Sequence, residues 1–360
     1  MKLGIVYSVV RSLSVFTRMA LLAVLVYPWS LYPCTTFSFK NQNQERVFAK
    51  SFDWFDGHGM LFTNKRNMQK EALVLDGTAP LSWVSRFGSV TFNQHARDFP
   101  LGGMNEAGLV VEIMVGPTED IPASPELKSV NEVQWIQYVL DSFSTIPEVI
   151  QGLQGIRVAR VSSKVHYLVC DKAADCATFE YLNGELVTHS GASLPYKAFT
   201  NSSYEDSADY ASNFSGLGGN QLTPNGTASL ARFTRAALAA KNFSSGNAIS
   251  YAHNVLDNVA ISGKWRIVYQ GLNEISFRTS QFLTNEKRVQ MTFDFECTTP
   301  VKNYRMSSAF DTGLVNQKFE DYTVEENTWL VEQNSMLPYE LQQALIAYPD
   351  TNTLCLTSLK

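Results

Sequence analysis

The sequence predicts an α+β fold in which β-sheets are sandwiched between layers of helices. Two observations support this prediction. Segments with strand character occur in groups, and a pair of helical segments separates each group from the next. This order differs from the strict strand–helix alternation of a parallel α/β fold. In addition, no internal repeat, low-complexity block or linker interrupts the chain after residue 33, so we expect residues 34–360 to form a single domain.

The residues before Cys34 have the features of a secretory signal peptide. A short apolar run at residues 19–26 follows a basic segment that has no acidic residue. The run is too short for a membrane-spanning helix, which needs about 20 apolar residues. We expect residues 1–33 to be removed and the protein to be periplasmic or secreted, without a stable membrane anchor. Cleavage directly before Cys34, or after Ser30 with later trimming, fits the sequence.

The first element expected after the signal peptide is a β-hairpin. Residues 35–39 and 46–52 have strand character, and the polar residues 40–45 between them form a turn. Such a hairpin returns the chain to its start. Lys50 and Asp53 should therefore lie beside Cys34 for a purely local geometric reason.

The rest of the chain supplies the remaining strands and four helices. Strands are expected at residues 61–63, 72–75, 83–92, 109–115, 163–170, 177–181, 184–189, 197–200, 265–269, 274–279 and 288–295. Helices are expected at 130–143, with Asn131 as N-cap, and at 147–153, 229–240 and 248–258. Residues 102–108 are expected to form a turn, 117–125 and 202–227 loops, and the C-terminal end a polar tail with short β-like segments.

Composition and charge exclude some classes of function. The chain has 29 Lys and Arg against 34 Asp and Glu, a formal net charge of −5, and no basic run, which argues against a nucleic-acid partner. No CxxC or HxH spacing suggests a metal site, and we expect no cofactor. Five cysteines are an odd number. If Cys34 is a free thiol, Cys170 and Cys176 could pair across a short turn; buried thiols or one incidental disulfide are the alternative.

Five short motifs resemble those of a known family, and they occur in the family's order. They are Cys34-Thr35-Thr36-Phe37, Phe52-Asp53-Trp54, Gly103-Met104-Asn105-Glu106-Ala107-Gly108-Leu109, Thr200-Asn201-Ser202 and Ala231-Arg232-Phe233. The chain from Cys34 to about residue 300 thus resembles the choloylglycine hydrolases and penicillin V acylases. These are linear amide C–N hydrolases with an N-terminal nucleophile. The resemblance implies an αββα four-layer sandwich of the Ntn-hydrolase type.

The resemblance also implies the roles of three residues. Cys34, once it is the first residue, would attack the amide carbon with its thiolate while its own α-amino group carries the proton. Asp53 would hold that amino group in place. Arg232 would close the back of the site, the alternative being a cation on the surface of a helix.

Two donors would stabilise the oxyanion, and one cation would tune the thiol. The side chain of Asn201 and the main-chain N–H of Val115 correspond to the family's oxyanion donors. At position 115 the family usually has Asn or Tyr, and a valine there could also be a plain core residue. Lys50 stands where the family usually has arginine; it could favour the Cys34 thiolate, although only arginine offers a planar fork of donors. A solvated lysine on a hairpin is the alternative.

These assignments predict an exported N-terminal-cysteine amidohydrolase. Its substrate would be a small N-acyl amide that joins a hydrophobic acyl group to an amine or amino-acid-like leaving group, of the penicillin V, bile salt or N-acyl-amide type. Substrate specificity is expected in the loops at 60–69, 117–125 and 202–227. Acyl transfer from the same thioester, and a non-catalytic exported binding module with Cys34 in a disulfide, are the alternatives. Relatives are often homo-oligomers, so a homo-oligomer is left open.

Overall fold

The protein is described from a computed structural model. It describes residues 33–279, 285–306, 313–334, 337–348 and 355–356. The expected signal peptide, apart from Pro33, lies outside the described residues, so its prediction is untested. Within the described part of the chain, no helix combines the length and apolar character that crossing a membrane requires.

One layer of the fold is a seven-stranded sheet built on the N-terminal hairpin. Its order is β14-β1-β2-β15-β16-β17-β19. The strands are β1 (Thr35–Lys40), β2 (Arg46–Phe52), β14 (Ala198–Phe199), β15 (Trp265–Gln270), β16 (Glu274–Thr279), β17 (Lys287–Gln290) and β19 (Gly313–Leu314). Every residue of β2 is buried, which is expected for a strand that is covered on both faces.

The second layer is a nine-stranded sheet with the order β13-β12-β11-β8-β7-β6-β3-β18-β20. Its strands are β3 (Met60–Asn64), β6 (Ser89–Ala96), β7 (Phe99–Asn105), β8 (Val110–Val115), β11 (Val165–Cys170), β12 (Cys176–Leu182), β13 (Glu185–Ser190), β18 (Lys302–Arg305) and β20 (Glu320–Asp321). Two small ribbons flank it, formed by β4 (Gln69–Glu71) with β5 (Ser82–Val84) and by β9 (Lys128–Val130) with β10 (Ile156–Val158).

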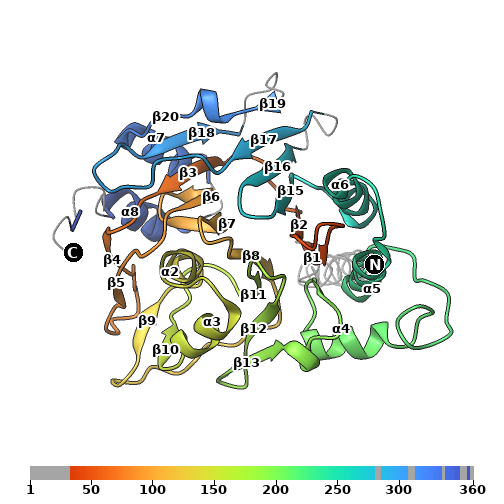
Figure 1. Cartoon of the computed structure of the whole chain (residues 1–360). Coiled ribbons are helices and arrows are strands. Elements are labelled where there is room, and N and C mark those ends of the chain that lie inside the picture. The colour runs from red at the N-terminus through yellow and green to blue at the C-terminus, as the bar shows by residue number, and fades with distance from the viewer. Residues whose placement is uncertain (1–32, 280–284, 307–312, 335–336, 349–354, 357–360) are drawn as a thin grey trace, which may run out of the picture. The chain divides into compact units, whose positions relative to one another are not determined.

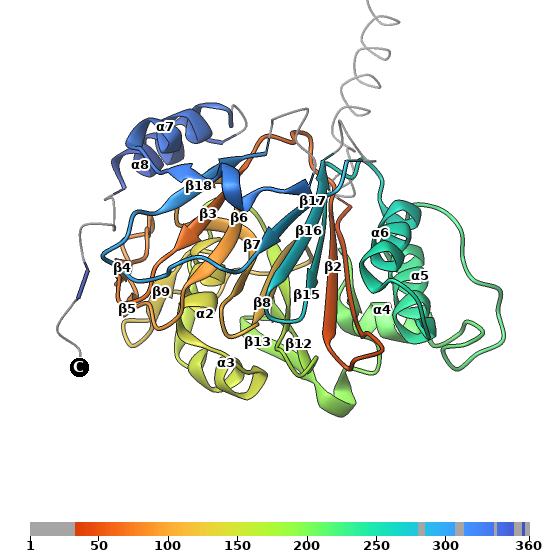
Figure 2. The ribbon, with the colours of Figure 1, turned by 45° about the horizontal axis from the view of Figure 1, so that its top comes forward.

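Helices cover the outer faces of both sheets (Figure 1). On the first sheet lie α5 (Ser229–Asn242) and α6 (Ala248–Val259), with α4 (Tyr204–Ala211) packed on α5. On the second lie α2 (Gln134–Ser142) with α3 (Ile146–Gly152) beside it, and also α7 (Val324–Glu332) with α8 (Tyr339–Ala347). Figure 2 shows the two sheets between these helical layers. The predicted αββα sandwich is therefore confirmed.

Aromatic side chains hold the two sheets face to face. The ring of Phe92 on β6 lies edge-on to Tyr269 and to Phe277 of the other sheet, with centroids 6.3 Å and 5.6 Å apart. Pairs of this geometry add to the stabilisation that burial gives. Polar side chains also enter this inter-sheet core, and they belong to the site described below.

Several predicted strands and turns differ from the structure in their type or their bounds. Residues 102–108 are not a turn, because β7 continues to Asn105 and only 106–107 turn. Gly102 and Gly103 serve close packing within the strand: a Cβ on Gly102 would lie 2.3 Å from the carboxyl carbon of Glu112. Residues 72–75 form no strand, and the stretch 83–92 is split between β5 and β6.

Helices were the elements most often missed. The expected loop at 202–227 contains α4, which begins where the Ser203 hydroxyl accepts the Asp206 N–H. The C-terminal end contains α7 and α8 instead of a polar tail with β-like segments. The helix expected from residue 130 begins at Gln134; Asn131 still accepts the N–H groups of Val133 and Gln134 with its side chain.

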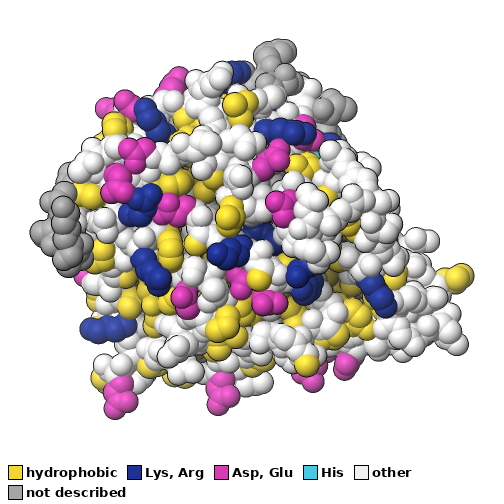
Figure 3. Space-filling model, in the orientation of Figure 1, with side chains coloured by type: hydrophobic (Ala, Val, Ile, Leu, Met, Phe, Trp, Pro, Cys, Tyr) yellow, Lys and Arg dark blue, Asp and Glu magenta, His cyan; other side chains and the backbone are white. Residues whose placement is uncertain are grey.

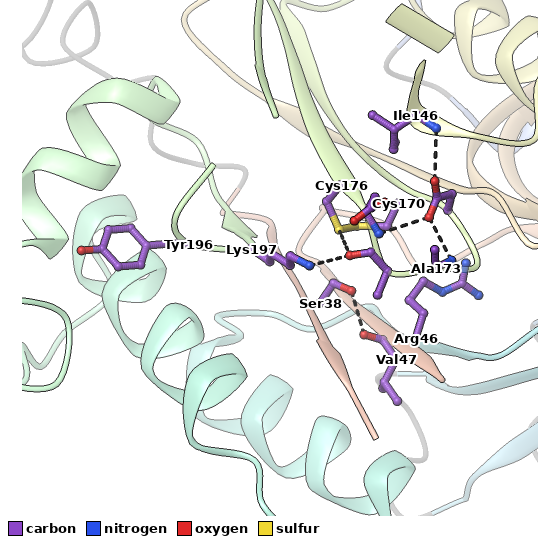
Figure 4. Close-up of a disulfide and its surroundings, with 12 residues drawn as sticks. Ser38, Arg46, Val47, Ile146, Cys170, Ala173, Cys176, Tyr196 and Lys197 are labelled. Atoms are coloured by element: carbon purple, nitrogen blue, oxygen red, sulfur yellow. Dashed lines mark hydrogen bonds between the residues drawn. A yellow bond between two sulfur atoms is a disulfide. The ribbon is translucent and has the colours of Figure 1, made fainter. Parts of the chain in front are cut away.

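Two disulfides account for four of the five cysteines, so the expectation of buried thiols or a single bridge is wrong. Cys170 and Cys176 pair across the β11–β12 turn, and Cys297 pairs with Cys355. Figure 4 shows the first bridge, next to which Lys197 donates to a main-chain carbonyl of the turn. Cys34 is the free cysteine. The alternative that placed Cys34 in a disulfide is therefore contradicted.

Candidate active site

Cys34 lies directly before β1, at the open end of the N-terminal hairpin. The predicted hairpin is confirmed: Thr35 pairs with Ser51 and Thr36 with Lys50. Cys34 is only 2% exposed. The structure thus brings Lys50 and Asp53 to the same end of the hairpin as the thiol.

Cys34 borders a small pocket that is partly open to solvent. The pocket is lined by Cys34, Phe52, Trp54, Gln94, His95, Leu101, Ile113, Val115, Glu132, Val133, Ser162, Ser163 and Val165. Most of these side chains are apolar, as in pockets that take hydrophobic ligands. None of the lining residues comes from the three loops expected to shape specificity. That expectation is wrong for this pocket, since sheet strands and the segments 132–133 and 162–163 form its walls.

Arg232 connects Cys34 to the predicted oxyanion donor Asn201. Its guanidinium donates to the carbonyl oxygen of Cys34 at 2.5 Å, to the hydroxyl of Thr35 at 2.6 Å and to the side-chain oxygen of Asn201 at 2.7 Å. A fourth bond, 3.0 Å long, goes to the carbonyl of Thr227. Arg232 is 2% exposed on α5, so the alternative of a surface cation is wrong.

Asn201 and Val115, the two predicted oxyanion donors, lie next to each other. The side-chain amide of Asn201 donates to the Val115 carbonyl at 2.7 Å. Gly116 N–H donates to the Lys164 carbonyl, so Val115 belongs to the neighbouring pair that is not hydrogen-bonded to β11. Its N–H and C=O therefore both point away from β11, towards the Asn201 amide.

The carboxylate of Asp53 is held by a loop of the first sheet. One oxygen accepts the N–H groups of Ile261, at 3.0 Å, and of Gly263, and the other accepts the Ser51 hydroxyl at 2.9 Å. The main chain of Asp53 also forms a hydrogen bond with Cys34. Asp53 thus lies where the prediction requires; its role towards a free amino group stays a prediction.

Lys50 is fully buried, so a solvated lysine is excluded. Its ammonium donates to the Ile113 carbonyl and lies 3.8 Å from a carboxylate oxygen of Glu112. The other Glu112 oxygen accepts the hydroxyl of Tyr269 at 2.5 Å. This cluster spans both sheets. Burial raises the pKa of Glu112 to about 7, against the opposing effects of Lys50 and Tyr269.

The groups around the Cys34 thiol shift its pKa in opposite directions. Burial raises the pKa of the thiol above its ordinary value, and the charge of Asp53 adds to this rise. The charges of Lys50 and Arg232, together with the hydrogen bond from the Asp53 main chain, lower the pKa. Burial prevails, so the thiol needs a base before it can act as a nucleophile.

A second buried pair, His166 and Glu180, contacts the main chain next to Asn201. The imidazole of His166 on β11 faces the Thr200 carbonyl at 2.7 Å and the Glu180 carboxylate at 3.3 Å. Glu180 also accepts the N–H of Tyr204, the first residue of α4. These contacts fix the main chain directly before Asn201.

The sequence reasoning missed Glu112, Glu180 and His166. The available signal was a single ionisable residue inside each apolar strand: Glu112 in Val-Val-Glu-Ile-Met-Val, Glu180 in β12 and His166 in Val-His-Tyr-Leu-Val-Cys. Among the described residues, no cluster of His, Cys, Asp and Glu has the arrangement of a metal site. On the face seen in Figure 3, basic and acidic side chains are interspersed.

Two packed sheets between helical layers form the architecture of the N-terminal-nucleophile hydrolase fold. Residues 34–280 match the model of the linear amide C-N hydrolases, choloylglycine hydrolase family. The chain belongs to this family.

Individual relatives agree with this assignment. Over 229 residues the chain is 27% identical to a penicillin V acylase of Pectobacterium atrosepticum, covering 58% of this chain and 60% of that protein. A penicillin V acylase from Agrobacterium tumefaciens has a similar structure, with a TM-score of 0.70 and 24% identity over 81% of this chain and 98% of that one. A conjugated bile acid hydrolase mutant from Clostridium perfringens has a TM-score of 0.63 at 14% identity, over 78% and 98%. The two structures support the fold.

Proposed function

We propose that this protein is an exported amidohydrolase whose nucleophile is Cys34, exposed as the N-terminal residue when the signal peptide is removed. It cleaves the C–N bond of a linear amide between a hydrophobic acyl group and an amine or amino-acid-like leaving group. The single observation that carries the proposal is the network around Cys34. Arg232 bonds to the nucleophile residue and to Asn201, and Asn201 bonds to Val115.

The choice of base for the Cys34 thiol supports the proposal that Cys34 is the N-terminal residue. The thiol of Cys34 has a raised pKa and needs a base, and the histidine that lines the pocket is His95. Burial lowers the pKa of His95 to about 4, which makes it a weak base. An α-amino group has a pKa of about 8 and would lie on the same residue as the thiol. In the full chain the nitrogen of Cys34 is a peptide nitrogen, so cleavage after Pro33 supplies the base.

The reaction follows from these positions. The α-amino group takes the thiol proton, and Sγ of Cys34 attacks the amide carbon. The Val115 N–H and the Asn201 side chain stabilise the oxyanion that forms. Collapse of this intermediate breaks the C–N bond, and the amine leaves with the proton from the α-amino group. Water then attacks the thioester, which releases the carboxylic acid and regenerates the thiol. Lys50 and Arg232 favour the thiolate, and Asp53 orients the hairpin end that carries it.

Mass spectrometry of the mature protein and a substrate panel test the proposal together. We expect Cys34 as the first residue and turnover of at least one of penicillin V, conjugated bile salts, N-acyl homoserine lactones and N-acyl amino acids. The Cys34→Ala variant should be inactive. An active preparation that begins at Ser30 or Leu31, or activity in the Cys34→Ala variant, would contradict the proposal. Added amine acceptors separate hydrolysis from acyl transfer, because transfer yields a new amide.

A further inference from the structure

Lys50 is an unusual residue for the inside of a protein. It is 0% exposed between the two sheets, and burial of an ammonium group is costly unless an anion and hydrogen-bond acceptors surround it. The acceptor is the Ile113 carbonyl. Two groups near Lys50 can carry negative charge, the Cys34 thiol and the Glu112 carboxyl. Burial raises the pKa of both groups, that of the thiol above its ordinary value and that of Glu112 to about 7, so above pH 7 the Glu112 carboxylate is the anion that faces Lys50.

The surroundings of Glu112 are built to hold its carboxylate in this place. Gly102 lies opposite Glu112 on β7, and a Cβ there would lie 2.3 Å from both carboxylate oxygens. Tyr269 donates its hydroxyl to Glu112 at 2.5 Å, and burial raises the pKa of Tyr269 well above its ordinary value, so it stays a donor. The absence of a side chain at Gly102 and the hydrogen bond from Tyr269 thus place the Glu112 carboxylate 3.8 Å from Lys50.

From this geometry we infer that Glu112 is a positioning residue: it holds the side chain of Lys50 in place between the sheets, and through Lys50 it favours the thiolate of Cys34. Glu112 itself does not touch the pocket. The charged and titratable groups that face it are Lys50 from β2 and Tyr269 from β15, and Arg46 acts on Tyr269 from the same side. The inference rests on the proposed function only for the role of the thiolate.

The test measures the thiol directly and needs no amide substrate. The rate of Cys34 alkylation by iodoacetamide, followed against pH, gives the apparent pKa of the thiol; the other four cysteines are in disulfides. In Glu112→Gln we expect this pKa to rise by about one pH unit, because the Lys50 side chain is no longer held where its charge favours the thiolate. With an amide substrate, kcat should fall while KM changes little. An unchanged or lower thiol pKa in the folded variant would overturn the inference.

Two further variants separate positioning from plain stability. Tyr269→Phe keeps the packing but removes the donor to Glu112, so the thiol pKa should rise by a smaller amount in the same direction. Asp141→Asn is the matched control, because Asp141 is another fully buried carboxylate, 3.1 Å from the buried Lys70 and bonded to Trp83. It should lower stability and leave the thiol pKa unchanged. An equal rise in Asp141→Asn would show a general effect of destabilisation and overturn the inference. If wild type alkylates as described but cleaves no amide, the proposed function fails and this inference stands.

Discussion

The side-chain amide of Asn201 donates a 2.7 Å hydrogen bond to the carbonyl of Val115. This bond joins a loop of the first sheet to the end of a strand in the second sheet. The N–H of Val115 points to the same side as its carbonyl, so it faces the same side of the strand as the Asn201 amide, and Val115 lines the pocket that Cys34 borders. The proposed oxyanion site therefore lies at a junction between the two sheets and depends on both of them.

Asn201→Ala should abolish most of the catalytic rate. Removal of one preorganised oxyanion donor lowers kcat by about 100- to 1000-fold in comparable enzymes, with little effect on KM. Steady-state kinetics of the mature enzyme measure this. Ser202→Ala is the control, because the Ser202 hydroxyl bonds to Ser229, which contacts the main chain of Asn201 and not its side chain; it should retain kcat within a few-fold. A kcat near wild type in Asn201→Ala would remove Asn201 from the oxyanion site.

Arg232→Lys should be nearly as harmful as removal of the side chain. Arg232 uses three nitrogen atoms for four acceptors, and the single ammonium of lysine cannot reach the acceptors on both Cys34 and Asn201. Loss of hydrogen bonds from a charged donor, worth about 1.5–3 kcal/mol each, predicts a fall in kcat of about 100-fold. Arg235→Lys on the same helix is the matched control, because Arg235 bonds only to Asn258 and Pro224 among the partners the structure gives it. Equal activity in both variants would contradict the prediction.

His166→Phe should act on the rate through the main chain of Thr200. The ring of phenylalanine fits the same buried space but leaves the Thr200 carbonyl without its 2.7 Å partner. Because one hydrogen bond contributes about 1 kcal/mol, we expect kcat to fall about fivefold with KM unchanged. His253→Phe, a buried histidine on α6 that contacts Ser276, should lose stability without this change in kcat. Similar kinetics in the two variants would reduce His166 to a structural residue.

The parts of the fold that the sequence predicted well are those stabilised locally. The hairpin of β1 and β2 follows from its turn and strand character, and α5 and α6 follow from amphipathic periodicity. By contrast, α4 lies in an Asn- and Ser-rich segment with little propensity for helix. It depends on the Ser203 cap and on Tyr204, whose ring lies edge-on to Phe233 of α5. Those contacts arise only once the chain has folded.

The residues of the candidate site also divide into those that a local pattern groups together and those that it does not. Cys34, Asp53 and Lys50 could be grouped from the hairpin, whereas Asn201 and Arg232 required the resemblance to a family. Glu112 is the cross-strand partner of Gly102 in one sheet, and Lys50 belongs to the other sheet. No local sequence pattern therefore pairs Glu112 with Lys50. An acid inside an apolar strand signals that a partner exists, but the identity of that partner depends on the packing of the two sheets.

Glu112 and His253 should give folding stability opposite dependences on pH. Burial raises the pKa of Glu112 from 4.5 to about 7 and lowers that of His253 from 6.5 to about 3. Between about pH 4.5 and 7 the folded state keeps a proton on Glu112 that the unfolded state has lost, so this residue makes stability fall as pH rises. Between about pH 3 and 6.5 the unfolded state binds a proton at His253 that the folded state does not. His253 therefore makes stability fall as pH falls.

Urea unfolding between pH 4.5 and 6.5 separates the two contributions. In Glu112→Gln the His253 contribution is left unopposed, so stability should increase more steeply with pH than in wild type, by up to about 1.4 kcal/mol per pH unit. In His253→Gln the slope should change by a similar amount in the opposite direction. Both variants keep a polar side chain of similar size, so the change in slope reports protonation more directly than the change in mean stability does. A slope in Glu112→Gln equal to that of wild type would mean that Glu112 ionises in the folded protein at its ordinary pKa.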